Sequence, residues 1–225
     1  MGQAIGNVLP LALGVALSPI PIVAVVLMLA TPRGKVNGPA FVLGWVVGIA
    51  IVGTVVLLVA GGASASSDGQ PKTWVSVLKL VLGLLLVLVA VRQWHGRPHG
   101  DAEPQLPDWM KAIDTFTPVK SFGLAVLLAG PNPKNLLLTI AAAAAIAQAG
   151  ISSGQQAIVL AIFIVIATLG PAIPLGIYYA LGDRSGDVLS KLRAWMVAHN
   201  QAIMAVLCAV IAAKLIGDAI AGFTS

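Results

Sequence analysis

The side chains best placed for chemistry in this sequence are charged residues within long apolar segments: Lys79, Lys134, Lys214 and Asp218. An ionised side chain at the centre of a membrane-spanning helix costs about 2.5–3.5 kcal/mol, so such residues mark ion, proton or substrate pathways. Lys214 and Asp218 are four residues apart and share a helix face, which predicts a structural ion pair or a charge relay. Lys79 is close to the end of its segment, where a long side chain can reach the surface.

Lys134 follows a Pro-x-Pro motif that occurs at two corresponding places, as Ser18-Pro19-Ile20-Pro21 and Gly130-Pro131-Asn132-Pro133-Lys134-Asn135. Proline removes a backbone donor and clashes with the carbonyl one turn earlier, so both helices should break near mid-membrane. The freed carbonyls need polar partners there. Aligning the motifs puts Pro19 on Pro131. We predict a substrate pathway lined by Ser18, Pro19, Pro21, Pro131, Asn132, Pro133, Lys134 and Asn135; the alternative is a pair of packing kinks.

The remaining motifs carry less information. Gly170, Pro171 and Pro174 interrupt a later apolar segment and predict a hinge or a widened cavity. Cys208 is the only cysteine, so neither an internal disulfide nor a CxxC redox pair can form. His95 lies in a polar loop without the ligand pattern of a metal site. No nucleophile–base pair can be assembled, so we expect neither an enzyme nor a bound cofactor or metal.

The elements that must position these residues are membrane helices. Apolar residues make up 58% of the 225-residue chain and charged residues 9%, with a mean hydropathy of +0.97. That leaves too little polar surface for a water-soluble globule. The net charge of +5 is scattered rather than clustered, so it does not indicate nucleic acid. Spans of about 20 residues predict an all-α protein with six crossings, at 5–30, 39–60, 74–93, 119–148, 155–181 and 199–222.

Three spans in each half require the second half to be inverted relative to the first. We predict a first repeat at 1–94, a cytoplasmic loop with an interfacial amphipathic helix at 95–118, and a second repeat at 119–225. Nine basic residues fall on one side of this topology and only Lys72 on the other. Basic loops stay in the cytoplasm, so both termini should face outward from the plasma membrane. Trp195 belongs to a second segment of amphipathic pattern, which should also lie in the membrane interface.

The Ser-Pro-Ile-Pro and Gly-Pro-Asn-Pro-Lys-Asn segments in two three-span halves resemble the LysE superfamily of exporters. Within it, nearly the whole chain is most similar to the peptidoglycolipid-addressing and sulfolipid-addressing protein family of actinobacteria. The resemblance implies export of large cell-envelope glycolipids together with a large lipid-transporter partner. Disulfide and metal carriers of the superfamily need paired cysteines, or His and acidic residues in the early helices, which this sequence lacks.

Three hypotheses follow. The first is a glycolipid transporter or accessory subunit, in which the lipid tails stay in the bilayer and only the headgroup needs a polar path. The second is a proton-coupled exporter of amino acids or other small solutes. The third is a non-transporting membrane scaffold for a larger lipid transporter. Assembly into a homo-oligomer is compatible with each, because small residues such as Gly44 and Gly48 permit close helix approach within or between subunits.

Overall fold

The computed structural model describes residues 1–64, 73–96, 108–130 and 132–224, and these residues form helices and connecting turns without a strand. The helices in chain order are α1 Gly2–Ala16, α2 Pro19–Leu29, α3 Gly34–Ser64, α4 Thr73–His95, the 3-10 helix η1 Asp108–Thr115, α5 Pro118–Ala129, α6 Pro133–Ala147, α7 Ser153–Leu181, the 3-10 helix η2 Gly182–Arg184 and α8 Ser185–Thr224.

These helices are those of a membrane protein. Three helical stretches among the described residues are long and apolar enough to cross a bilayer: Gly34–Ala60, Ser76–His95 and Ser153–Phe223. The pairs α1–α2 and α5–α6 pass the same test, which gives up to five spans when each pair counts as one. The two pairs bend by 49° and 66°. The predicted breaks in the first and fourth apolar segments are therefore confirmed.

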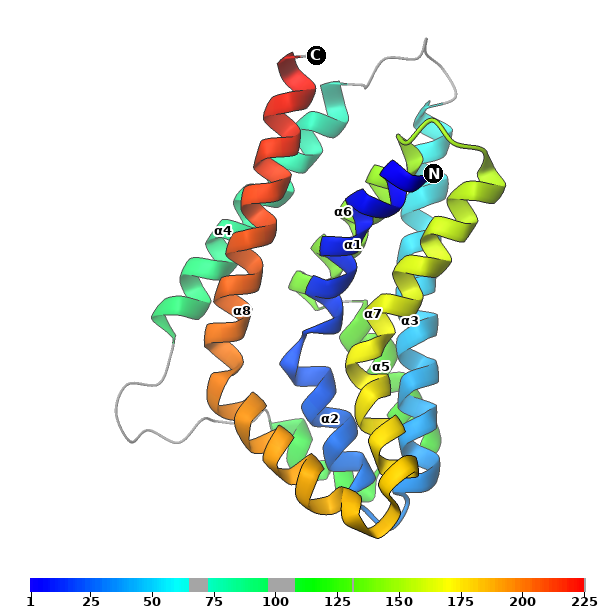
Figure 1. The fold of residues 1–225 in the computed structure, drawn as a ribbon, viewed down its shortest axis with the longest axis vertical. Helices are drawn as coiled ribbons and strands as arrows, with labels where there is room; N and C mark the ends of the chain where they lie inside the picture. The colour runs from blue at the N-terminus through cyan, green and yellow to red at the C-terminus, as the bar shows by residue number, and fades with distance from the viewer. Residues whose placement is uncertain (65–72, 97–107, 131, 225) are drawn as a thin grey trace.

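The stretch Ser153–Phe223 contains a reversal of the chain. Gly182, directly after α7, has a φ of 51°, a left-handed conformation that glycine adopts without a Cβ penalty. Figure 1 shows α7 running down to this turn, the first part of α8 crossing the lower end of the molecule, and the rest of α8 running back up. The two helices therefore run in opposite directions.

Both chain ends lie near the upper end of Figure 1, while the α2–α3 and α7–α8 connections and the start of α5 lie at the lower end. We call the lower end the basic end, because its elements carry Arg33, Lys35, Lys120, Arg184, Lys191 and Arg193. In the body of the molecule, α1 packs on α6 and α7, and α3 packs on α5 and α6. The helices α4 and α8 form a pair beside it (Figure 1).

Two glycines of α3 set its distance from α5. A Cβ at Gly44 would collide with the carbonyl oxygen of Phe122, and a Cβ at Gly48 would come within 2.8 Å of the Ala129 side chain. The GxxxG motif thus permits close backbone approach inside one subunit. Trp45, which lies between these glycines, is fully buried and stacks on Phe41.

Both segments predicted to lie in the membrane interface are helical, and their place in the interface stays a prediction. The segment around Trp195 is the first part of the continuous helix α8 rather than a separate short helix; Leu189 is buried there, while Val188 and Trp195 are exposed. This first part of α8 lies across the lower end of the molecule before the helix turns upward (Figure 1). The other segment is the 3-10 helix η1, whose Ile113 is buried, and Asn37 Nδ2 of α3 donates to the following Phe116 carbonyl at 2.9 Å.

Candidate functional site

The first break separates α1 from α2 at Leu17 and Ser18. Ser18 has an extended backbone, with φ −69° and ψ 115°, and Pro19 is the first residue of α2. Proline suits this position because the first N–H groups of a helix have no intrahelical acceptor and its fixed φ is already helical. The first Pro-x-Pro motif therefore starts a half-helix.

The second break has the same local geometry in a different register. Asn132 precedes α6 with φ −62° and ψ 115°, and Pro133 is the first residue of α6. Ser18 is thus equivalent to Asn132, and Pro19 to Pro133, two residues away from the alignment expected from the sequence. Pro131 lies outside the described residues.

The carbonyl of Gly14 is freed by the first break and takes a partner from the second half of the chain. In a continuous helix it would accept from the N–H of Ser18, four residues on. That N–H instead donates to Val15 O at 3.2 Å. Lys134 Nζ donates to Gly14 O at 2.6 Å across 120 residues of sequence, and its side chain is only 2% exposed. Lys134, which follows the second break, thereby supplies the hydrogen-bond donor that a backbone carbonyl at the first break lacks.

Asn135 joins the two breaks directly. Its Nδ2 donates to Leu128 O, near the end of α5, at 3.4 Å, and its Oδ1 accepts from Ser18 Oγ at 2.9 Å. Asn135 is fully buried and Ser18 is 2% exposed. A side-chain amide suits this place because it offers donors and an acceptor together. Three of the predicted pathway residues, Ser18, Lys134 and Asn135, are thus buried and make two separate hydrogen-bonded connections between the breaks, Ser18–Asn135 and Lys134–Gly14; we refer to these residues together as the network.

The side chain of Trp45 donates a hydrogen bond to a backbone carbonyl of α7 that a proline leaves without a donor. Pro171 has no N–H to donate to the carbonyl of Ala167, four residues earlier. The indole nitrogen of Trp45 donates to Ala167 O at 3.2 Å. The sequence reasoning did not single out Trp45, although a carbonyl four residues before a buried proline is a signal that some donor is needed.

The glycine and prolines of α7 lie inside an unbroken helix. Gly170, Pro171 and Pro174 are all buried. A Cβ at Gly170 would collide with the carbonyl oxygen of Ala16, so this glycine lets α7 approach the end of α1. The role of these residues as a hinge stays a prediction.

The side chains of this network are buried in the structure. None of its three side chains lines the cavity of about 470 Å³ found at the basic end. Among the described residues, no carboxylate lies within ion-pair distance of Lys134. Asn132 is half-buried and its side chain does not cap α6. Ser18, Lys134 and Asn135 thus hydrogen-bond to groups of the protein in this structure, and their role as a substrate pathway stays a prediction.

Lys214 and Asp218 form the predicted ion pair. Lys214 Nζ lies 2.6 Å from Asp218 Oδ2, and the side chains are 25% and 36% exposed. No hydrogen bond or ion pair within the described ranges joins this pair to Lys134. Those ranges also hold no group of three His, Cys, Asp or Glu that could bind a metal ion. A relay through the pair stays a prediction.

The comparison with protein families matches residues 8–221 to the model described as Sap, sulfolipid-1-addressing protein. The chain belongs to this family. The region matched to the sulfolipid-1-addressing protein family includes both breaks, the Ser18–Asn135–Lys134 network and the Lys214–Asp218 pair. No match was found among curated proteins or among solved structures.

Proposed function

We propose that this chain is a transport subunit that moves the headgroup of an anionic cell-envelope glycolipid, a sulfolipid, across the plasma membrane. Membership of the sulfolipid-1-addressing protein family supports the substrate class. It favours a lipid over the amino acids that other LysE-type exporters move. The proposal contains no catalytic step, because it requires only a polar route for the headgroup while the acyl chains remain in the bilayer.

We further propose six crossings in two inverted halves, at 1–94 and 119–225, joined through 95–118. This count treats the antiparallel helices α7 and α8 as separate spans. In these two repeats α1 corresponds to α5, α3 to α7 and α4 to α8. The packing supports this correspondence, because α3 packs on α5 as α7 packs on α1, and α4 packs on α8. With the basic end in the cytoplasm, both termini face outward. This orientation is again a proposal.

The observation that carries the transport function is the position of Lys134. A buried ammonium in a membrane protein is costly and marks a substrate or ion path. This one has no carboxylate partner among the described residues, and its acceptor is a backbone carbonyl at a helix break. A sulfated headgroup is a better acceptor for an ammonium than a neutral carbonyl, since hydrogen bonds between charged groups are stronger. We propose that the headgroup displaces Gly14 O from Lys134 as it passes.

The experiment compares lysine variants in sulfolipid-producing cells that lack the native protein. Lys134→Met removes a charged hydrogen bond of about 1.5–3 kcal/mol, so surface sulfolipid should form about tenfold to a hundredfold more slowly. Lys79→Met is the matched control, because Lys79 is also a lysine within a span but is half-buried and outside the network. It should leave the surface lipid unchanged. Protein abundance in the membrane is measured in parallel, so that loss of folding is separated from loss of transport.

Normal surface sulfolipid in well-expressed Lys134→Met would refute the proposed pathway. If such cells instead lost surface lipid on Trp195→Ala, the chain would be a scaffold for a larger lipid transporter. Trp195 suits this arm of the test because it is 51% exposed on α8. A chain that exports amino acids from liposomes and leaves sulfolipid untouched would belong to the solute-exporter class.

A further inference from the structure

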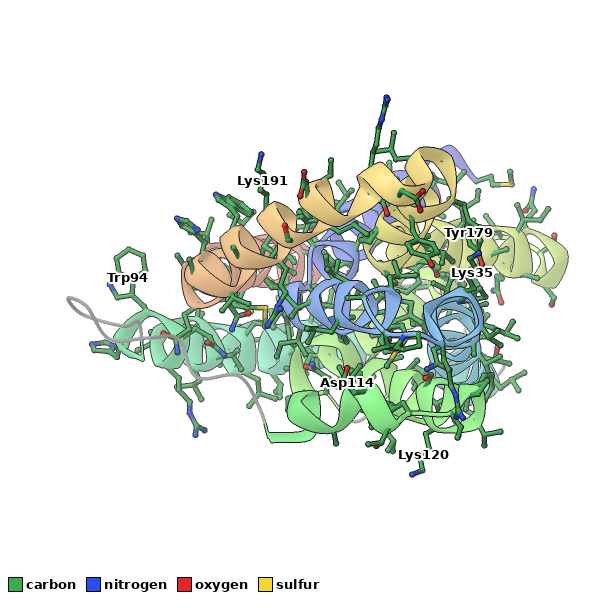
Figure 2. The ribbon with its side chains drawn as sticks, turned by 90° about the horizontal axis from the view of Figure 1, so that it is seen from below. Lys35, Trp94, Asp114, Lys120, Tyr179 and Lys191 are labelled. Atoms are coloured by element: carbon green, nitrogen blue, oxygen red, sulfur yellow. The ribbon has the colours of Figure 1, made fainter. Side chains whose placement is uncertain are left out.

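The basic end contains a cavity that none of the roles above uses. It has a volume of about 470 Å³ and lies between the end of α2, the start of α3, the end of α7 and the start of α8. Figure 2 views the molecule from this end, with Lys35 and Tyr179 beside one another at the junction of α3 and α7. Ligand pockets in proteins typically enclose about 300–1,000 Å³, so this volume is sufficient for part of a ligand.

The inner wall of this cavity is apolar. Val26 and Leu29 of α2 and Leu189 of α8 line it, and each is between 4% and 5% exposed. Tyr178 lines it from α7 and packs edge-to-face against Tyr179, with ring centroids 5.5 Å apart. Such a wall favours an acyl chain or another apolar group, because contact with it removes apolar surface from water.

The outer part of the cavity is polar and carries more positive than negative charge. Its charged residues are Lys35, Asp183 and Arg193. Within the described part of the chain, none of the three is in an ion pair. The hydroxyl of Tyr179 donates to the backbone carbonyl of Lys35 at 2.8 Å, which ties the end of α7 to the start of α3. Lys35 and Arg193 come from different helices and both line the cavity, which suits an anionic group, and the guanidinium of Arg193 can bind its oxygens in a bidentate manner.

We infer that this cavity binds an anionic amphiphile, with the negative headgroup between Lys35 and Arg193 and the adjoining apolar part against Val26, Leu29 and Leu189. The inference rests on the proposed function and deepens it, because it gives the transported lipid a binding site at the end we place in the cytoplasm. The chemistry that is recognised is a sulfate or phosphate ester joined to an apolar chain. The cavity is too small for a whole multi-acyl lipid, so it receives the headgroup region and leaves the remaining tails in the bilayer.

The test uses the purified full-length chain in detergent, titrated with lipid and followed by native mass spectrometry. The probes are a sulfated galactosylceramide, phosphatidylglycerol and inorganic sulfate. The double variant Lys35→Gln/Arg193→Gln should bind the sulfated glycolipid about tenfold more weakly or worse. The charge-matched control is Arg33→Gln/Lys191→Gln, which removes two exposed basic residues of the same end that do not line the cavity. It should bind as the native chain does.

Equal weakening in the two double variants would overturn the inference, because the effect would then come from overall charge. Unchanged binding in Lys35→Gln/Arg193→Gln would overturn it as well. If inorganic sulfate bound as tightly as the glycolipid, the ligand of the cavity would be a free anion, and the assignment to an amphiphile would be overturned. Phosphatidylglycerol bound as tightly as the sulfated glycolipid would uphold the site and assign it to anionic lipids in general.

This outcome is separable from the proposed function. If the cavity variants bind normally while Lys134→Met still slows the formation of surface sulfolipid, only the cavity assignment fails. If binding is lost in the cavity variants while Lys134→Met transports normally, the cavity stands and the proposed pathway fails.

Discussion

Trp45 and Pro171 should be energetically coupled through one backbone carbonyl. Pro171 deprives Ala167 O of its intrahelical donor, and the Trp45 indole supplies the replacement at 3.2 Å. Trp45→Phe removes that donor and leaves a buried carbonyl unsatisfied, at a cost of about 1–3 kcal/mol. Because 3.2 Å is at the long end of N–H···O distances, we expect the lower part of this range, about 1–2 kcal/mol.

The same substitution should cost less when the helix can satisfy itself. Pro171→Ala restores an N–H four residues after Ala167, so Trp45→Phe in that background loses only packing. Packing losses are common to both backgrounds and cancel in a double-mutant cycle. We expect a coupling free energy of about 1–2 kcal/mol, measured by equilibrium unfolding of the four proteins in mixed micelles of increasing dodecyl sulfate content and followed by circular dichroism.

Pro174→Ala is the matched control for this cycle. Pro174 lies in the same helix and is also buried, but it leaves a different carbonyl, that of Gly170, without a donor. Trp45→Phe should therefore cost the same with and without Pro174→Ala. If the Trp45–Pro171 coupling fell within about 0.5 kcal/mol of zero, the limit for independent sites, the assignment of Trp45 as the replacement donor would be wrong.

Two further predictions concern helix packing and the ion pair. Gly44→Ala should lower the free energy of unfolding by about 1–3 kcal/mol, because the new Cβ collides with the Phe122 carbonyl. The control is Gly123→Ala, whose Cβ meets nothing within 4 Å and which should change the free energy of unfolding by less than about 1 kcal/mol. Equal losses in the two variants would contradict the close contact between α3 and α5. Asp218→Asn should destabilise by less than about 1 kcal/mol, since its ion pair with Lys214 is partly exposed, and surface sulfolipid should stay normal; loss of the lipid would restore the relay hypothesis.

The sequence was sufficient for the features that depend on local chemistry. Proline has no N–H, so the positions of the two breaks followed directly from Pro19 and Pro133. Lys214 and Asp218 pair because residues four apart share a helix face. Lys134 and Asn135 could be singled out because they are polar side chains adjoining a break in an otherwise apolar helix, while their role in a substrate pathway stays a prediction.

The partners of these groups could not be read from the sequence. Trp45 and Ala167 are 122 residues apart, and the helices that carry them are apolar on all sides, so no periodicity indicates which faces meet. The alignment of the two breaks was offset because matching one Pro-x-Pro to the other ignores which proline begins a helix. The cavity at the basic end depends on how four helix ends come together, which is a property of tertiary packing alone.

The hydrogen bond between Lys134 and Gly14 O affects which molecules can enter between α1 and α6. It links helices from different halves of the chain, so moving α1 away from α6 strips a carbonyl of its donor inside a low-dielectric core. That exposure costs about 1–3 kcal/mol unless another donor arrives at the same moment. The hydroxyl groups of a sugar can make this replacement, and an acyl chain cannot. Discrimination between sugar-bearing lipids and plain hydrocarbon would then follow from the hydrogen-bonding demand of the backbone, without any pocket shaped to the sugar.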